Sequence, residues 1–300
     1  MTKKRDWKRF LKKNYEGWLF NLPLFIGLVV FTAIPVFTSL YYSFFETDGF
    51  TYEFIGLGNY IKIFTRDRSI VQVVKNTLTF ALISIPLNLI LSYLLAQLVN
   101  LSLKGIKAFR VIYYLPVIIP LVVAGLLWKD LYDPTYGIFN KILSLVGVDP
   151  FPFFHAANTS MFSIILMNVW GIGGGMVLWL AAFKNIPKSL YESASLDGAN
   201  AFKRFWHITI PMSTPMIFFN VVTSIIGTLQ YNGTLTFAPR GGRGVDDSLF
   251  MYAVKIYWEA FNRGEIGYGS ALAWLLLIVV AIITVILFKN SKWVFYGEDS

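Results

Sequence analysis

Six long stretches without a charged residue divide this 300-residue chain, and they limit its fold more than any other feature. A helix rises about 1.5 Å per residue, so about 20 apolar residues cross the ~30 Å hydrocarbon core of a bilayer. The chain is 56% hydrophobic and only 14% charged, which excludes a soluble globular enzyme. We therefore predict an all-α integral membrane protein with six transmembrane helices, within residues 17–45, 76–103, 111–128, 156–183, 205–239 and 266–288.

The distribution of basic residues predicts how these helices are oriented. Seven Lys and Arg residues precede residue 14, ahead of a first apolar stretch that is too long for a cleaved signal peptide. Cytoplasmic segments of membrane proteins are rich in Lys and Arg. With both termini in the cytoplasm, the predicted inner segments carry 16 basic and 6 acidic residues, against 10 and 11 outside. We predict a basic cytoplasmic tail (1–16), a six-helix transmembrane domain (17–290) and a cytoplasmic C-terminal tail (291–300).

Residue types that build metal or redox centres are scarce in this sequence. It has no cysteine, and His155 and His207 are far apart without a carboxylate at a spacing typical of metal ligands. We therefore expect no metal site, no cofactor and no catalytic residue in this chain. The run from Arg240 to Gly244 is similar in composition to an RNA-binding element, but it lies in a predicted outer loop without an aromatic stacking platform. We expect no nucleic-acid partner.

The segment 184–211 is the longest predicted cytoplasmic loop, yet it is too short to form a domain. Pro187 suits the first turn of a short helix that ends near Leu196. Gly198 suits a left-handed residue just beyond this helix. Small side chains leave part of the helix surface without bulk at Ser193, Ala194 and Ser195. We predict a helix that can enter a groove on a partner.

The residues of this loop resemble a known motif. The stretch from Glu192 to Ala199 reads Glu-Ser-Ala-x-x-Asp-Gly-Ala and is similar to the EAA loop of ABC importer permeases, with Ser193 in place of the usual alanine. The sequences at 76–77, 110–116 and 267–271 resemble the carbohydrate-uptake branch of that family. This branch comprises MalF/UgpA-like, binding-protein-dependent transport system inner membrane components. The resemblance implies the type I ABC importer permease fold and assigns coupling to an ATPase to Glu192, Ser193, Ala194, Asp197, Gly198 and Ala199.

The resemblance also implies that the chain is one subunit of a complex in a bacterial inner membrane. The expected partners are a second homologous permease subunit, two ATP-binding cassette subunits and an extracellular solute-binding protein. The chain itself contains no Gly-x-x-x-x-Gly-Lys-Ser/Thr and no Gly-Lys dipeptide, so it cannot bind ATP through a P-loop. We expect ATP and Mg²⁺ to bind the partner ATPase, and we expect this chain not to be an enzyme.

Sugars need hydrogen bonds to their hydroxyls and apolar contact with their C–H faces, so a translocation path needs polar side chains beside aromatic ones. Two predicted helices offer this mixture. We predict a substrate path through Asn168 and Trp170 in the fourth helix and through Gln230, Tyr231 and Asn232 in the fifth. A polar side chain facing lipid is costly, so we expect Asn168 and Gln230 to face the bundle interior.

Helix packing is the alternative explanation for these residues. Gly171 and Gly175 form a small-xxx-small pattern, which lets two helices approach closely, and a lone asparagine can hydrogen-bond between helices. Pro86, Pro116 and Pro120 are expected to kink helices rather than to contact substrate.

A secondary transporter or a channel is the alternative from another class, since six helices alone do not specify an ATP-driven importer. Ion-coupled carriers usually place ionisable residues within their helices, and the predicted helices contain none. We predict the permease subunit of an ATP-driven, binding-protein-dependent importer of sugars, in particular oligosaccharides. Glycerol-phosphate compounds are the alternative substrate, although an anion would favour Lys or Arg along the path.

Overall fold

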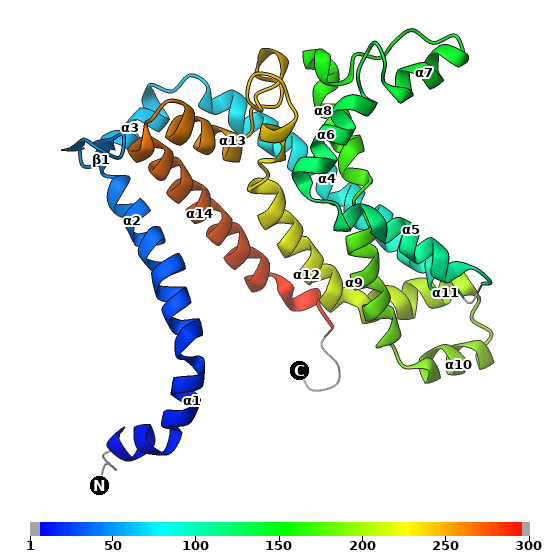
Figure 1. The fold of residues 1–300 in the computed structure, drawn as a ribbon. Helices are drawn as coiled ribbons and strands as arrows, with labels where there is room; N and C mark the ends of the chain where they lie inside the picture. The colour runs from blue at the N-terminus through cyan, green and yellow to red at the C-terminus, as the bar shows by residue number, and fades with distance from the viewer. Residues whose placement is uncertain (1–6, 102, 296–300) are drawn as a thin grey trace.

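The computed structural model describes residues 7–101 and 103–295, most of which are helical (Figure 1). Four helical segments are continuous, long and apolar enough to cross a bilayer: Gly17–Tyr42, Ile70–Val99, Ala201–Leu229 and Ile266–Lys289. Two further candidates are pairs of helices joined at a bend, so the count reaches six only if each pair is one span. The prediction of a helical, multi-pass membrane protein is confirmed, whereas the predicted third and fourth helices are each broken in two.

The first span lies at the edge of the molecule and consists of α1 (Trp7–Leu28), the π-helical turn η1 (Val29–Ala33) and α2 (Ile34–Tyr42) (Figure 1). α1 begins inside the predicted tail 1–16, and residues 1–6 of that tail lie outside the described residues. Pro35 follows the π turn because proline has no N–H and its ring clashes with the carbonyl four residues earlier. The wider turn accommodates both effects.

A small β-hairpin, which the all-α prediction missed, follows this span. β1 (Phe45–Thr47) pairs antiparallel with β2 (Tyr52–Phe54). The carboxylate of Asp48 accepts hydrogen bonds from the backbone N–H groups of Phe50 and Thr51 at 2.9 and 2.8 Å, and Gly49 has φ +96°. These contacts fix the turn that brings the two strands together. α3 (Gly58–Thr65) comes next and leads to α4 (Ile70–Val99).

The third predicted helix is bent by 100° between α5 (Ile106–Ile118) and α6 (Leu121–Leu131). Ile119 is extended, with ψ 125°, and Pro120 follows it. A residue before proline avoids the helical region because its backbone clashes with the proline ring. The expected effect of Pro120 is confirmed, but it produces a sharp break rather than a kink. The fourth predicted helix bends by 43° between α8 (Ala157–Val169) and α9 (Gly173–Lys184).

Two glycines allow α9 to pack closely on its neighbours. A Cβ atom at Gly173 would lie 1.9 Å from the carbonyl oxygen of Tyr113 on α5. A Cβ atom at Gly175 would lie 2.9 Å from the side chain of Ser92 on α4. A Cβ atom at Gly171 would meet only the Asn168 carbonyl oxygen within 4 Å, at 3.5 Å. Close helix packing therefore requires glycine at positions 173 and 175, whereas position 171 has room for a Cβ atom.

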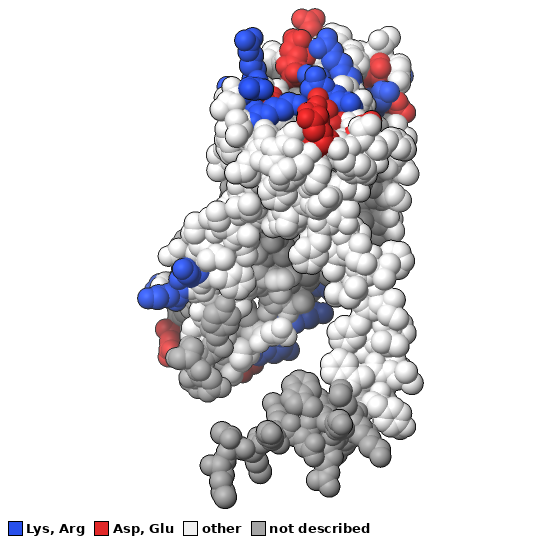
Figure 2. All heavy atoms as spheres, turned by 90° about the vertical axis from the view of Figure 1, so that its left-hand side faces the viewer, with Lys and Arg blue, Asp and Glu red and all other residues white. Residues whose placement is uncertain are grey.

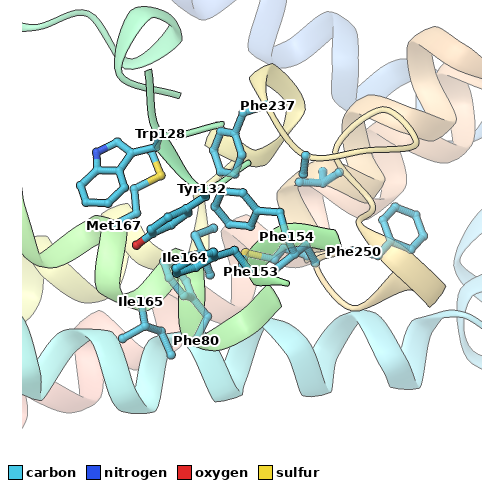
Figure 3. Packing of buried hydrophobic residues seen from close by; sticks show 14 of the residues in the cluster. Phe80, Trp128, Tyr132, Phe153, Phe154, Ile164, Ile165, Met167, Phe237 and Phe250 are labelled. Carbon is cyan, nitrogen blue, oxygen red and sulfur yellow. The ribbon is translucent and has the colours of Figure 1, made fainter. Parts of the chain in front are cut away.

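One end of the molecule carries the hairpin, α3 and several short elements (Figure 1). These are α7 (Ile138–Leu145), η2 (Phe153–His155), η4 (Gly233–Thr236), η5 (Val245–Asp247), α13 (Tyr252–Tyr257) and η6 (Trp258–Asn262). The largest hydrophobic core lies here and joins α4, α6 and α8 to the loops (Figure 3). In this core the ring of Tyr132 stacks on that of Phe153 with 4.0 Å between centroids. Burial of such rings holds the end of α6 against the segment that leads into α8, away from the two bends.

The opposite end carries α10 (Lys188–Leu196), α11 (Ala201–Arg204) and both ends of the described chain (Figure 1). α12 (Ile210–Leu229) and α14 (Ile266–Lys289) run between the two ends, and η7 (Ser291–Trp293) follows α14. Val294 is buried, and the N–H of Phe295 donates a hydrogen bond to Thr214 Oγ1 on α12 at 2.9 Å. The start of the predicted C-terminal tail therefore packs on the helices, and residues 296–300 lie outside the described residues.

Candidate functional site

The predicted coupling loop folds as a short helix followed by a tight turn. Pro187 caps α10 with extended backbone, and Gly198 has φ +75° beyond its end. The side chain of Asn200 accepts a hydrogen bond from the N–H of Lys203 at 2.9 Å, which caps α11. The π turn η3 (Phe205–Thr209) then joins α11 to α12 in one continuous helix. The helix and the left-handed glycine predicted from the sequence are both confirmed.

The six residues assigned to coupling lie on this helix and turn, but they differ in exposure. Glu192, Ser193, Asp197 and Gly198 are exposed, whereas Ala194 and Ala199 are half-buried. These two alanines line a hollow of about 350 Å³ between α10 and α11, together with Lys203, Arg204, His207 and Ile208. The two alanines therefore border open space between α10 and the segment 203–208.

Leu196 is a functional candidate that the sequence analysis missed. Leu196 is the last residue of α10 and is 90% exposed. Leu190 on the same helix is 40% exposed, so α10 presents two apolar side chains at its surface. The signal was present in the sequence as two leucines in a short helix outside the six apolar stretches.

Two side-chain hydrogen bonds attach α10 to the helix that follows. The hydroxyl groups of Tyr191 and Thr209 lie 2.9 Å apart. Arg204 Nη1 donates a hydrogen bond to Ser195 Oγ at 2.9 Å. Neither pair was predicted, because the turn over residues 197–200 decides which residues of the two helices meet.

A cavity of about 480 Å³ lies at the bends of both broken helices. Ile119 and Pro120 line it from the first bend, and Asn168 and Trp170 line it from the second. Tyr231 lines it from the segment after α12. The structure therefore brings together three of the five residues predicted for the substrate path.

The other two path residues, Gln230 and Asn232, are exposed and do not line this cavity. The prediction that residues 230–232 belong to the fifth helix is wrong, since α12 ends at Leu229. Beyond this end, Gly233 lies against the Tyr231 ring. A Cβ atom at Gly233 would be 2.5 Å from the Tyr231 hydroxyl.

The cavity combines polar groups with aromatic and apolar walls. The buried Tyr231 hydroxyl lies near the side chain of Asn168, but the two form no hydrogen bond of regular geometry. Asn168 Nδ2 makes only a long hydrogen bond of 3.4 Å to the Ile164 carbonyl. Trp170 packs edge to face on Trp128, with 5.7 Å between centroids. The Asn168 amide can therefore serve a ligand with hydroxyl groups, whereas the Tyr231 hydroxyl is sealed within the protein.

Charge and metal ligands are not features of this cavity. Its lining, as far as the structure describes it, includes no charged side chain. Among residues 7–101 and 103–295, no group of three or more His, Asp or Glu residues is placed to hold a metal ion. An uncharged polar ligand suits such a cavity better than an ion does.

Comparison with known proteins identifies the family. Residues 88–291 match the model of the binding-protein-dependent transport system inner membrane component family. The chain is 39% identical over 294 residues to the probable ABC transporter permease protein YesP of Bacillus subtilis, covering 95% of this chain and 93% of YesP. It is 31% identical over 281 residues to the trehalose/maltose transport system permease protein MalF of Thermococcus litoralis, covering 92% and 94%.

A solved structure has the same fold. A chain of a bacterial alginate ABC transporter, crystallised in complex with alginate pentasaccharide-bound periplasmic protein, matches with a TM-score of 0.85. The match covers 96% of this chain and 98% of the other at 23% identity. Both candidate sites lie inside the region that matches the family model. The chain belongs to the family of binding-protein-dependent transport system inner membrane components, the transport permeases of ABC importers.

Proposed function

We propose that this chain is the permease subunit of an ATP-driven importer of uncharged sugars, in particular oligosaccharides. The observation that carries this proposal is the cavity where Asn168, Trp170 and Tyr231 meet without a charged side chain among its described lining. Relatives with sugar names support it, such as MalF of Thermococcus litoralis and the lactose permease LacF of Rhizobium radiobacter, which is 29% identical.

Glycerol-phosphate compounds are the alternative substrate. The sn-glycerol-3-phosphate permease UgpA of Yersinia pestis is 31% identical over 281 residues. A phosphate in a low-dielectric cavity needs Arg or Lys as a partner. The uncharged lining around Asn168 and Tyr231 therefore favours sugars over phosphate esters.

We further propose six membrane spans, with both termini and α10 in the cytoplasm. In this arrangement α10 docks on a separate ATPase, which binds ATP and Mg²⁺, and the exposed residues Glu192, Ser193 and Leu196 face that partner. The hairpin end faces an extracellular solute-binding protein, and a second homologous permease completes the path between the subunits.

α12 connects the two candidate sites mechanically. Its 20 residues form a rod about 30 Å long. The Tyr191–Thr209 contact attaches α10 to one end of this rod, and Tyr231 follows the other end directly. A movement of α10 on the ATPase therefore shifts Tyr231 relative to Asn168 and Trp170, which changes the cavity that holds the sugar.

Cysteine labelling tests the proposed orientation, since the chain has no native cysteine. Asn185→Cys and Leu196→Cys should resist an impermeant thiol reagent in intact cells, whereas Phe50→Cys and Leu145→Cys should react. All four residues are exposed in the structure. Labelling of Asn185→Cys from outside would overturn the proposed topology.

Reconstitution in proteoliposomes with the partner subunits tests the function itself. A solute-binding protein loaded with a neutral oligosaccharide should stimulate ATP hydrolysis and uptake. Stimulation by glycerol-phosphate compounds alone would reject the sugar assignment. Uptake driven by an ion gradient without ATP would reject the importer assignment.

A further inference from the structure

The first turns of α12 are a weakened stretch of helix. The π turn η3 (Phe205–Thr209) comes directly before α12, and Pro211 and Pro215 lie near its start. A proline has no N–H to offer to a carbonyl in the preceding turn, so each one removes a backbone hydrogen bond. Prolines and π turns are the usual places where helices bend. We call residues 205–215 the hinge, because they separate α10 from the rest of α12.

The hydroxyl group of Thr214 repairs part of this hinge. Pro215 cannot donate to the carbonyl of Pro211, four residues earlier. Thr214 Oγ1 donates a hydrogen bond to this carbonyl instead, at 2.7 Å. A hydroxyl group has one donor and two acceptor lone pairs, so Thr214 Oγ1 can still accept a hydrogen bond after donating its own.

The segment that follows α14 supplies the donor for this acceptor. The N–H of Phe295 donates a hydrogen bond to Thr214 Oγ1 at 2.9 Å. Beside it, Val294 is buried in a small hydrophobic cluster with Phe218 of α12. The ring of Phe218 also packs edge to face on that of Trp293, with 6.2 Å between centroids. Each residue of the segment 293–295 therefore contacts α12.

We call residues 293–295 the strap, because they join the end of α14 to the first turns of α12. Figure 2 shows an uncharged band between charged side chains at the two ends of the molecule. Lys289 and Lys292 are the first charged residues after the apolar stretch of α14, and the strap follows them directly. The strap therefore contacts α12 at the same end of the molecule as α10 (Figure 1).

Two hydrogen bonds meet at one oxygen atom, Thr214 Oγ1. One bond closes the hinge itself, and the other ties the hinge to the strap. A bend at Pro211 or Pro215 displaces Thr214, and hydrogen bonds weaken steeply when their distance or angle changes. Bending the hinge therefore costs contacts with the strap as well as contacts within α12.

We propose that the strap stiffens the hinge, so that a movement of α10 shifts the whole of α12 instead of bending its first turns. The inference rests on the proposed function, in which α10 moves on a separate ATPase. Thr214 is then a positioning residue, since it lies outside the cavity around Asn168 and acts by holding the hinge in one geometry. Without the strap, ATP hydrolysis continues but moves the cavity less.

Two deletions test the strap in the complete transporter, reconstituted in proteoliposomes with its substrate-loaded binding protein. Deletion of residues 293–300 removes the strap, whereas deletion of residues 296–300 keeps all of the contacts described above. We expect uptake per ATP hydrolysed to fall in the first variant and to stay near the wild-type value in the second. This ratio does not depend on the amount of folded complex, so a loss of stability alone does not change it.

Substitutions at Thr214 test the link without shortening the chain. Thr214→Val should lower uptake per ATP about 2- to 13-fold, as the loss of one neutral hydrogen bond from the coupled geometry predicts. Thr214→Ser keeps the hydroxyl group and should keep the wild-type ratio. Thr223→Val is the matched control, because Thr223 is exposed on α12 and its hydroxyl bonds to carbonyls of its own helix.

A second substitution separates stiffness of the hinge from other effects of Thr214. Pro215→Ala introduces an N–H that can bond to the Pro211 carbonyl and restore the helix. In the Thr214→Val background we expect it to recover most of the lost uptake per ATP. Absence of any recovery would overturn hinge stiffness as the reason for the loss.

Spin labels provide a measurement that does not depend on transport. Cysteines introduced at Ser189 on α10 and at Gln230 beyond α12 bracket the hinge, and both positions are exposed in a chain without native cysteine. In nanodiscs, the distribution of distances between the labels should be broader in Thr214→Val and in the 293–300 deletion than in the wild type and Thr223→Val. Equal widths in all four proteins would overturn the proposal.

Failure of the proposed function is recognised separately. In that case the loaded binding protein would not stimulate ATP hydrolysis by the wild type, and the spin labels would still test the strap. Normal stimulation of the wild type, with the same uptake per ATP in Thr214→Val and in the 293–300 deletion, would reject only the strap.

Discussion

The hydroxyl group of Tyr191 on α10 lies 2.9 Å from that of Thr209, the residue directly before α12. Thr209 is buried. Together with the exposed hydrogen bond from Arg204 to Ser195, the contact attaches α10 to the segment that leads into α12. In the proposed coupling, a force on the short helix reaches α12 through these two contacts.

We expect Tyr191→Phe and Thr209→Val to weaken coupling. Each variant removes one hydrogen bond between neutral groups, which contributes about 0.5–1.5 kcal/mol. Sugar-stimulated ATP hydrolysis and uptake per ATP should both fall, and the double variant should be little worse than either single one. Ser189→Ala, at an exposed position on the same helix, is the control. Wild-type uptake per ATP in both single variants would show that the contact does not transmit force.

Leu196→Ser should reduce binding of the ATPase without harming the permease fold. The residue is 90% exposed, so its replacement leaves no cavity in this chain. Loss of a leucine that becomes buried in a partner costs about 1.5–3 kcal/mol. Co-purification of the ATPase measures the effect. Leu145→Ser is the matched control, because Leu145 is 85% exposed at the opposite end. Equal recovery of the ATPase with both variants would exclude Leu196 from the interface.

Gly198→Val should uncouple ATP hydrolysis from the sugar through the backbone alone. Gly198 has φ +75°, and a Cβ atom there would meet nothing within 4 Å. A β-branched residue is strained at this φ, whereas asparagine tolerates it. Gly198→Asn should therefore keep most of the sugar-stimulated activity that Gly198→Val loses. Equal losses in the two variants would show that the added side chain, and not strain at this backbone angle, causes the uncoupling.

Asn168→Ala should lower sugar uptake, while Gln230→Ala should have little effect. Asn168 lines the cavity at the two helix bends, and Gln230 is exposed outside it. A lost hydrogen bond to a neutral hydroxyl should cost about 0.5–1.5 kcal/mol, or about 2- to 13-fold in affinity. Transport assays at limiting sugar concentration measure this effect, and co-purification of the partner subunits checks assembly. A larger loss of uptake in Gln230→Ala than in Asn168→Ala would place the substrate path outside this cavity.

Asp67→Asn should destabilise the protein at neutral pH but not in strong acid. Burial opposes ionisation of Asp67, but hydrogen bonds from Lys255, Tyr268 and Ser69 outweigh it and lower its pKa to about 2. Because the folded-state pKa is below the unfolded value of about 3.9, the stabilisation is complete above pH ~4–5 and is lost as the pH falls toward 2. Thermal unfolding at pH 7 and pH 3 should show a larger difference in Tm at pH 7. Asp246→Asn, at an exposed position, is the control.

Composition predicted the membrane class and the approximate positions of the apolar helices, because about 20 consecutive apolar residues are typical of a transmembrane helix. The short helix before Gly198 was also predictable, since proline, small residues and glycine each have local backbone preferences. The 100° break at Pro120 was not, because proline sets only the local dihedral angles and the bend angle depends on packing. The position of Tyr231 beyond α12 depends on Gly233 and on the core that Tyr231 packs against.

The hydrogen bond between the Tyr268 hydroxyl and Asp67 Oδ2 has a consequence for biosynthesis. The two residues are 201 positions apart. Ribosomes add about 5–20 residues per second, so Tyr268 is synthesised roughly 10–40 s after Asp67. Lys255, its other main partner, is also made late in translation. An unpaired charge is too costly to bury in the meantime. The segment around Asp67 therefore stays hydrated during insertion, and it can settle against α13 only when the last membrane helix has begun to leave the ribosome.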